Sequence, residues 1–151
     1  MTADYINPFL LATASVFDSM LAVKIERKKP FLRKAFDPQY EVTGVIGLTG
    51  KATGTVAFSL PSAVAIAITA KLLGEQPTSV NAQVADAVGE VTNMIVGAAK
   101  AQLASLELSL GLPTVVIGRE ACIAFPSRAV PISIPFATEL GDMVVEVGIV
   151  G

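Results

Sequence analysis

The chain has 151 residues, 52% of them hydrophobic and 16% charged, so it is long enough for one domain with a substantial core and too apolar to be disordered. Its formal net charge of −2 argues against nucleic acid as the main ligand, because binding to phosphates needs a concentrated basic surface. Histidine is absent and Cys122 is the single cysteine, which excludes an intrachain disulfide, a zinc site of the usual composition and a Ser-His or Cys-His catalytic pair.

The N-terminal segment carries Asp4 and no basic residue ahead of an apolar run, so we expect no secretory signal and a cytoplasmic protein. The run 52–70 has no charge and is nearly long enough to cross a bilayer, but glycine, proline, serine and threonine dilute it. We therefore expect no membrane insertion. Instead, Leu60 should end a buried strand and Pro61 should begin a helix.

The first predicted helix spans Asn7–Ala22, with Asn7 as its N-cap and Pro8 in its first turn. The basic stretch 24–34 follows and holds six of the eleven Lys and Arg residues. We interpret it as a solvated linker or an edge strand, and a docking surface for an acidic partner is the alternative. From Glu41 to Leu60, alternating apolar residues around a glycine-containing turn predict a β-hairpin.

Two further helices are predicted after this hairpin. The shorter one spans Pro61–Leu73 and has Gly74 as its stop signal. Its inward face comprises Val64, Ile68, Leu72 and Leu73. The longer one begins near Ser79 and runs to about Leu106, and its length makes it the scaffold of the domain.

Four strands are predicted in the remainder of the chain, at 114–118, 122–125, 130–137 and 143–150. Pro131 and Pro135 of the third strand lack a backbone donor, so this strand should lie at an edge or have one face open. A partly free edge of this kind would provide a dimer contact.

These elements predict a single α+β domain over residues 1–151, in which a mixed or antiparallel sheet is packed by two long helices and one shorter helix. A helix followed by a hairpin occurs twice, first at 7–22 and 41–60 and then at 79–106 and 130–150. The similarity predicts a pseudo-duplicated unit, with chance recurrence of a simple pattern as the alternative.

The predicted helix 79–106 carries a narrow polar stripe. At roughly 100° per residue, the positions of this stripe fall within about 80° of one another, and apolar residues occupy the opposite side. Gly89 and Gly97 lie on or beside the stripe, where each costs about 1 kcal/mol relative to alanine, which suggests that something approaches the helix closely. The stripe consists of Asp86, Glu90, Asn93, Gly97 and Lys100.

Glu90 and Asn93 form a Glu-x-x-Asn pair, which places a carboxylate and an amide one helical turn apart. Both groups could therefore point at a single external atom or group. From the spacing alone, a solvated surface pair is the alternative.

Six blocks spread over nearly the whole chain resemble the CheX members of the CheC/CheX/FliY family, which are phosphatases for bacterial chemotaxis response regulators. The core signature of that family is an acidic residue or serine, three residues, Glu, two residues and Asn, and it is met at Asp86, Glu90 and Asn93. The six blocks are Ile6–Phe9, Thr43–Gly50, Leu72–Glu75, Asp86–Ile95, Leu112–Gly118 and Ile134–Phe136.

The resemblance implies a CheC-like fold and hydrolysis of the aspartyl phosphate on a phosphorylated CheY-like receiver. It implies that Asn93 orients the attacking water, that Glu90 pairs with the active-site lysine of the receiver and that Asp86 is an accessory contact. An acyl phosphate is already activated, so positioning of the water matters more than a strong base. No cofactor is implied on this chain, since Mg²⁺ is expected on the receiver.

The resemblance also bears on the glycines and on assembly. Gly89 and Gly97 would let the helix backbone enter the receiver's cleft, although close packing within the domain explains them equally well. A homodimer joined through β structure is implied, and the strand from Val130 could supply the contact. Relatives with two active sites repeat the signature on the other long helix, but the segment 6–22 has no Glu, so we expect one site per chain.

Two other functions stay open at this level. One is a non-catalytic, dimeric CheX-like module that binds a receiver or a component of the flagellar switch. The other is a purely structural dimer in which the polar stripe is merely solvated.

Overall fold

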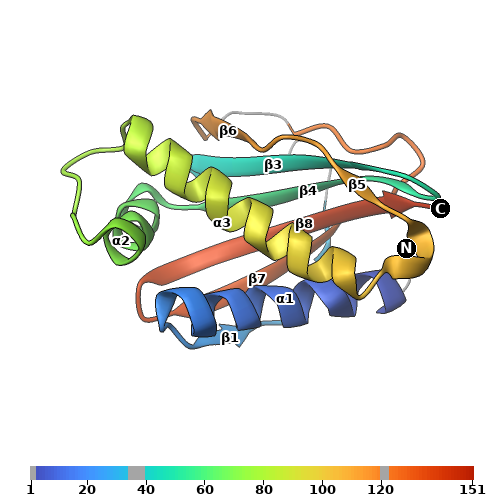
Figure 1. Cartoon of the computed structure of the whole chain (residues 1–151), viewed down its shortest axis with the longest axis horizontal. Helices are drawn as coiled ribbons and strands as arrows, with labels where there is room; N and C mark the ends of the chain where they lie inside the picture. The colour runs from blue at the N-terminus through green and yellow to red at the C-terminus, as the bar shows by residue number, and fades with distance from the viewer. Residues whose placement is uncertain (1–2, 34–39, 120–122) are drawn as a thin grey trace.

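Two long helices lie side by side across one face of an antiparallel sheet, and a shorter helix lies at one end of that face (Figure 1). The computed structural model describes residues 3–33, 40–119 and 123–151. The helices are α1 (Ala3–Leu21), α2 (Ser62–Leu73) and α3 (Ala82–Ala101), the last followed by a 3₁₀ turn at Ala104–Leu106. The strands are β1 (Ile25–Arg27), β2 (Phe31–Leu32), β3 (Val42–Thr49), β4 (Thr53–Leu60), β5 (Ser109–Leu110), β6 (Thr114–Ile117), β7 (Ile132–Thr138) and β8 (Gly141–Val150).

The sheet runs in the order β1-β7-β8-β4-β3-β5, with β2 also beside β7 and β6 also beside β3. The pairings between these strands are antiparallel. The hairpins β3–β4 and β7–β8 therefore meet at the β4–β8 pairing in the middle of the sheet. This arrangement confirms the predicted α+β fold and makes its sheet antiparallel.

The two halves of the chain are built alike. In the first half, α1 precedes the short strands β1 and β2 and the hairpin β3–β4, and in the second half α3 precedes β5 and β6 and the hairpin β7–β8. Each half places its short strands against the hairpin of the other half, because β1 and β2 pair with β7 whereas β5 and β6 pair with β3. The helix-plus-hairpin repeat is thus present in the fold, and a common origin of the halves stays a hypothesis.

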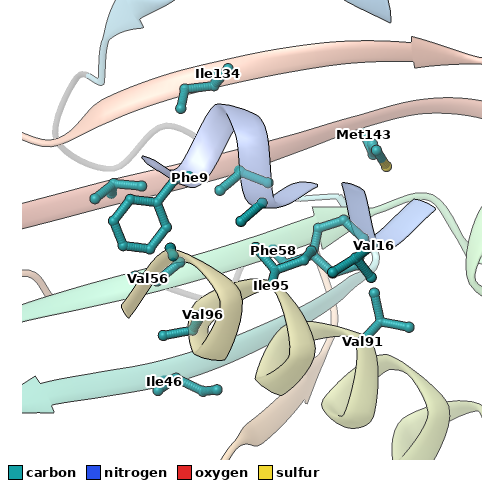
Figure 2. Packing of buried hydrophobic residues seen from close by; sticks show 14 of the residues in the cluster. Phe9, Val16, Ile46, Val56, Phe58, Val91, Ile95, Val96, Ile134 and Met143 are labelled. Atoms are coloured by element: carbon teal, nitrogen blue, oxygen red, sulfur yellow. The ribbon is translucent and has the colours of Figure 1, made fainter. Parts of the chain in front are cut away.

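The core lies between the helices and the sheet, and Figure 2 shows side chains from both layers meeting there. Phe9 and Phe17 of α1 are almost fully buried, and the Phe17 ring packs edge-on against the Phe58 ring of β4, with 6.1 Å between the ring centroids. Such a pair adds roughly 0.5–1.5 kcal/mol to the effect of burying its area. Ile95 of α3 and Met143 of β8 belong to the same core.

The ends of two helices differ from the prediction. α1 begins at Ala3 rather than Asn7, so Pro8 lies inside the helix. Proline removes one helical hydrogen bond there, and its ring is buried. α3 is shorter than 79–106 because the Asn81 side chain caps its start, accepting a hydrogen bond from the backbone N–H of Val84 (3.1 Å), and because the chain tightens into the 3₁₀ turn after Ala101.

The uncharged run 52–70 is divided between β4 and α2, as predicted. Pro61 is the N-cap of α2, and Gly74 adopts the left-handed conformation (φ 75°) that ends the helix. Leu73 is 52% exposed and does not face inward as predicted, because it lies one residue past Leu72 and so turns off the buried side. In the described ranges, no helix combines the length and the apolar character that crossing a bilayer requires.

β7 is an internal strand, so of the two predicted alternatives for the proline-bearing strand the edge position is wrong and an open face is left. The carbonyl oxygen of Pro135 accepts a hydrogen bond from the backbone N–H of Lys28 (2.9 Å), just beyond the end of β1. In an antiparallel ladder the N and O of one residue face the same neighbour, so the missing donor of Pro135 faces the gap between β1 and β2. Because both sides of β7 are paired, this strand has no free edge to which a second copy could add a strand, and the dimer contact stays a prediction.

Ile123–Phe125 does not form the predicted strand, and Cys122 lies outside the described residues. Pro126 follows directly and cannot donate to a ladder. Phe125 instead covers the sheet on the face opposite the helices, where a Cβ atom at Gly148 would lie 2.7 Å from its ring. The short strand β5, which was not predicted, pairs with the end of β3.

The basic stretch 24–34 forms the strands β1 and β2 at the sheet edge, which confirms the edge-strand interpretation, and Lys34 lies outside the described residues. Arg33 differs from the exposed cations of this stretch. Its guanidinium forms an ion pair with Glu146 of β8, and both side chains are almost fully buried. Glu146 also accepts a hydrogen bond from the Ser133 hydroxyl (2.7 Å), so a buried polar cluster ties β2, β7 and β8 together. The exposed cations are Lys24, Arg27, Lys28 and Lys29.

Candidate functional site

α3 presents the predicted polar stripe to solvent. The opposite side of the helix packs on β3 and α1 and is buried at Val84, Val88, Val91 and Ile95. The stripe itself is exposed at Asp86, Glu90, Asn93, Gly97 and Lys100. The predicted amphipathic helix is therefore confirmed, and the residues of the signature come together on one accessible face.

Glu90 and Asn93 are available to an external molecule. Within the part of the chain that the structure describes, neither side chain takes part in a hydrogen bond or an ion pair. A carboxylate accepts hydrogen bonds from an ammonium group, and a carboxamide offers a donor and an acceptor in fixed geometry. The pair can therefore bind a positive group and orient a small polar molecule, such as water, beside it. Residues 3–33, 40–119 and 123–151 contain no cluster of three or more His, Cys, Asp or Glu that could hold a metal ion.

Thr92, the residue before Asn93, makes a close contact between α3 and the sheet. Its hydroxyl donates a hydrogen bond to the carbonyl oxygen of Val88 (2.7 Å), and the side chain is fully buried over Gly44 of β3. A Cβ atom at Gly44 would overlap the Thr92 hydroxyl and lie 3.1 Å from its Cβ. Gly44 is thus a positioning residue for the stripe that the sequence analysis missed. A glycine inside a predicted strand was the available signal, since it often marks a close approach of another backbone.

We expect Gly44→Ala to lower the free energy of unfolding by about 1–3 kcal/mol, because the added methyl group forces α3 away from β3. Gly47→Ala is the matched control on the same strand, since a Cβ atom there would have nothing within 4 Å. This variant should keep the wild-type stability or gain up to about 1 kcal/mol, because alanine loses less backbone freedom on folding than glycine. Urea unfolding measures both variants. Equal effects at the two positions would contradict a tight contact between α3 and β3.

The two glycines of α3 lie in different environments. Gly89 is buried, and a Cβ atom there would lie 3.5 Å from Cγ2 of Val115 and 3.8 Å from Pro113, so β6 and the residue before it pack closely beside the helix. Gly97 is exposed, and a Cβ atom there would have nothing within 4 Å. A methyl group at Gly89 would make only ordinary van der Waals contacts, so packing within the domain does not require a glycine there, and Gly97 leaves open space at the stripe.

An open hollow of about 480 Å³ lies between α3 and β6. It is lined by Ala85, Asp86, Gly89, Glu90, Pro113 and Val115. A second open hollow lies further along α3 and includes Gly97 and Lys100. Two carboxylates thus share the first hollow with apolar side chains of the neighbouring segment, and Asn93 follows one turn later on the helix.

Comparisons with known proteins point to one family. The family model described as "Chemotaxis phosphatase CheX" matches residues 42–137. Among solved structures, a CheC-like superfamily protein from Shewanella sp. PV-4 is 33% identical over 100% of both chains, with a TM-score of 0.90. The chemotaxis protein CheX from Vibrio vulnificus is 30% identical over 98% of this chain and 100% of its own, with a TM-score of 0.88.

A chain of the CheX-CheY-BeF₃-Mg²⁺ complex from Borrelia burgdorferi is 26% identical over 99% of this chain and 100% of its own, with a TM-score of 0.83. A comparison with curated proteins gives no match. The solved structures cover the whole domain, and the family model covers β3 to β7, the part of the chain that includes α3.

Proposed function

Since the chain belongs to the CheX family of chemotaxis phosphatases, we propose that it hydrolyses the aspartyl phosphate of a CheY-like receiver in bacterial chemotaxis. The observation that carries the proposal is the pair Glu90 and Asn93, exposed on α3 and unengaged by other described residues. The complex of CheX with CheY from Borrelia burgdorferi supports a receiver as the partner.

In the proposed reaction, Asn93 holds the water that attacks the phosphorus atom. The side-chain oxygen accepts a hydrogen bond from the water and the NH₂ group donates one, so an oxygen lone pair can be aimed in line with the bond that breaks. That bond joins phosphorus to the aspartyl oxygen, and the aspartate leaves as a carboxylate while inorganic phosphate forms. Because a carboxylate is a good leaving group, holding the water contributes more than removing its proton.

Glu90 binds the active-site lysine of the receiver in this proposal, and Asp86, one turn earlier, is an accessory contact. Both acids line the hollow between α3 and β6, so a cationic side chain entering it would meet two negative charges. Gly89 lines the same hollow, and Gly97 leaves space for the receiver to approach the helix.

We propose that the chain brings no cofactor of its own. Mg²⁺ would be held by the receiver, where it neutralises charge on the phosphoryl oxygens. The protein would then complete an active site whose nucleophile-binding groups come from α3 and whose charge-stabilising groups come from the partner.

We also propose that the protein acts as a homodimer in the cytoplasm. In the described part of the chain, the sheet ends at β1 and β2 on one side and at β5 and β6 on the other. Strands at the ends of a sheet have unpaired backbone groups that a second copy can bind. The contact would form at one of these ends, because β7 is paired on both sides.

The test uses the CheY-like receivers of the same genome, each phosphorylated with acetyl phosphate in Mg²⁺, and follows the decay of the phosphorylated form. We expect a substoichiometric amount of the protein to accelerate the decay of its cognate receiver at least tenfold. Equal decay with and without the protein would contradict the enzyme. Binding without acceleration would favour the non-catalytic module.

We expect Glu90→Ala to raise KM for the phosphorylated receiver at least tenfold, because the receiver's lysine is left without its charged partner. Initial rates over a range of receiver concentrations measure this change. Glu26→Ala is the matched control, since Glu26 is an exposed acid on β1 at the opposite end of the sheet from β6. An equal KM for the two variants would contradict the assigned role of Glu90.

A further inference from the structure

Leu112 is a solvent-exposed apolar residue that lies next to the candidate site in the chain. It is 90% exposed, the highest value among the large apolar side chains of the described residues. Burying a leucine side chain is favourable, so this exposure forgoes a contribution that a bound partner could recover. The position of Leu112 decides which partner that is.

The backbone on both sides of Leu112 is fixed. The N–H of Gly111 donates a hydrogen bond to the carbonyl oxygen of Gly47 on β3 (2.9 Å). Pro113 has a restricted φ angle, packs beside Gly89 of α3 and lines the same hollow as Glu90. Leu112 therefore directly precedes a residue that lines the hollow, on a segment that is held at both ends, and little backbone freedom would be lost when it is covered.

Apolar side chains also occur on β6, the strand that follows Leu112. Val115 lines the hollow next to Glu90, and Ile117, two residues further on the same face of the strand, is 56% exposed. The two acids of α3 are thus flanked along one side by apolar side chains. A charged centre beside an apolar contact that excludes water is the usual composition of an interface hot spot.

We infer that Leu112 is an apolar anchor for the receiver, buried against an apolar surface next to the receiver's phosphorylation cleft. This inference rests on the proposed function. If Glu90 and Asn93 reach into that cleft, the rim of the cleft must cover the side chains that share the hollow with Glu90. Leu112 adjoins this hollow through Pro113, so it lies where the rim would make contact.

The test compares Leu112→Ser with Leu32→Ser in the dephosphorylation assay with the acetyl-phosphate-treated receiver. Leu32 is 61% exposed on β2, at the opposite end of the sheet from β6, and is the matched control. We expect Leu112→Ser to raise KM about tenfold and to leave kcat unchanged, because the anchor binds the receiver without touching the reacting atoms. Leu32→Ser should change neither KM nor kcat. Leu112→Met keeps an apolar side chain at this position, so its KM should stay close to that of the wild type.

Several outcomes would overturn the inference. An unchanged KM for Leu112→Ser, in a protein that dephosphorylates the receiver, would refute the anchor and leave the proposed function intact. A lower urea midpoint for Leu112→Ser than for the wild type would also refute it, since the side chain would then support the fold. Failure of the wild type to act on or bind any receiver would instead overturn the proposed function, and the anchor with it.

Discussion

Replacing Asn93 by alanine is expected to slow dephosphorylation of the receiver by about two to three orders of magnitude while leaving docking largely intact. The amide is the only group on the proposed path that both accepts from and donates to the attacking water, and a misplaced water loses the in-line geometry on which the reaction depends. Its side chain is exposed and forms no hydrogen bond or ion pair with another described residue, so the variant should fold normally. Single-turnover decay of the phosphorylated receiver measures the rate.

Binding of the receiver loaded with BeF₃⁻ and Mg²⁺, a mimic of the phosphorylated state, separates catalysis from docking. Asn93→Ala should bind this form with nearly the wild-type dissociation constant. Gln102→Ala, which removes an exposed amide at the C-terminal end of α3, is the control and should keep full activity. A rate for Asn93→Ala within a factor of three of the wild type would remove Asn93 from the mechanism.

Replacing Arg33 by methionine is expected to lower the free energy of unfolding by about 3–5 kcal/mol. Glu146 is 1% exposed, and its carboxylate accepts hydrogen bonds from Arg33 and from the Ser133 hydroxyl. Its second oxygen is buried without a hydrogen bond among the described residues. Loss of the guanidinium would leave this carboxylate buried without its positive partner. An uncompensated buried charge is what makes the removal of one partner of a buried ion pair strongly destabilising.

Urea unfolding of two further variants shows whether the ion pair is responsible. Arg27→Met removes an exposed arginine from β1 and should change stability by less than about 0.5 kcal/mol. The double variant Arg33→Met with Glu146→Met should lose much less stability than Arg33→Met alone, because neither buried charge remains. A double variant as unstable as the single one would indicate that Arg33 stabilises the fold through other contacts.

Local patterns were enough to predict most elements and the face that carries the site. The helical period placed Glu90 and Asn93 on the exposed side of α3, and alternation around Gly50 predicted the hairpin β3–β4. The start of α3 was predicted near Ser79, a few residues early, because the cap is Asn81. These features depend on residues within one or two turns of one another, which is why a single sequence specifies them.

Features that depend on distant residues were not predicted. Pro135 lacks a backbone donor, and for that reason its strand was predicted to lie at an edge or to have one face open. The structure tolerates the missing donor because it faces the gap between β1 and β2, more than 100 residues earlier in the chain. A separation of 113 residues likewise hides the pairing of Arg33 with Glu146. Gly89 and Gly97 look alike in the sequence, and only the position of β6 shows that one is packed and the other open.

The exchange of short strands between the two halves has a consequence for folding kinetics. Ile25 pairs with Thr138 and Val45 pairs with Thr114, so each half needs long loops to close before its own short strands gain partners. Folds dominated by such non-local pairing fold slowly, in about milliseconds to seconds, and without stable fragments. The surface of α3 that we propose for the receiver should therefore become available in one step with the whole domain, and a partly synthesised or cleaved chain should not sequester the receiver.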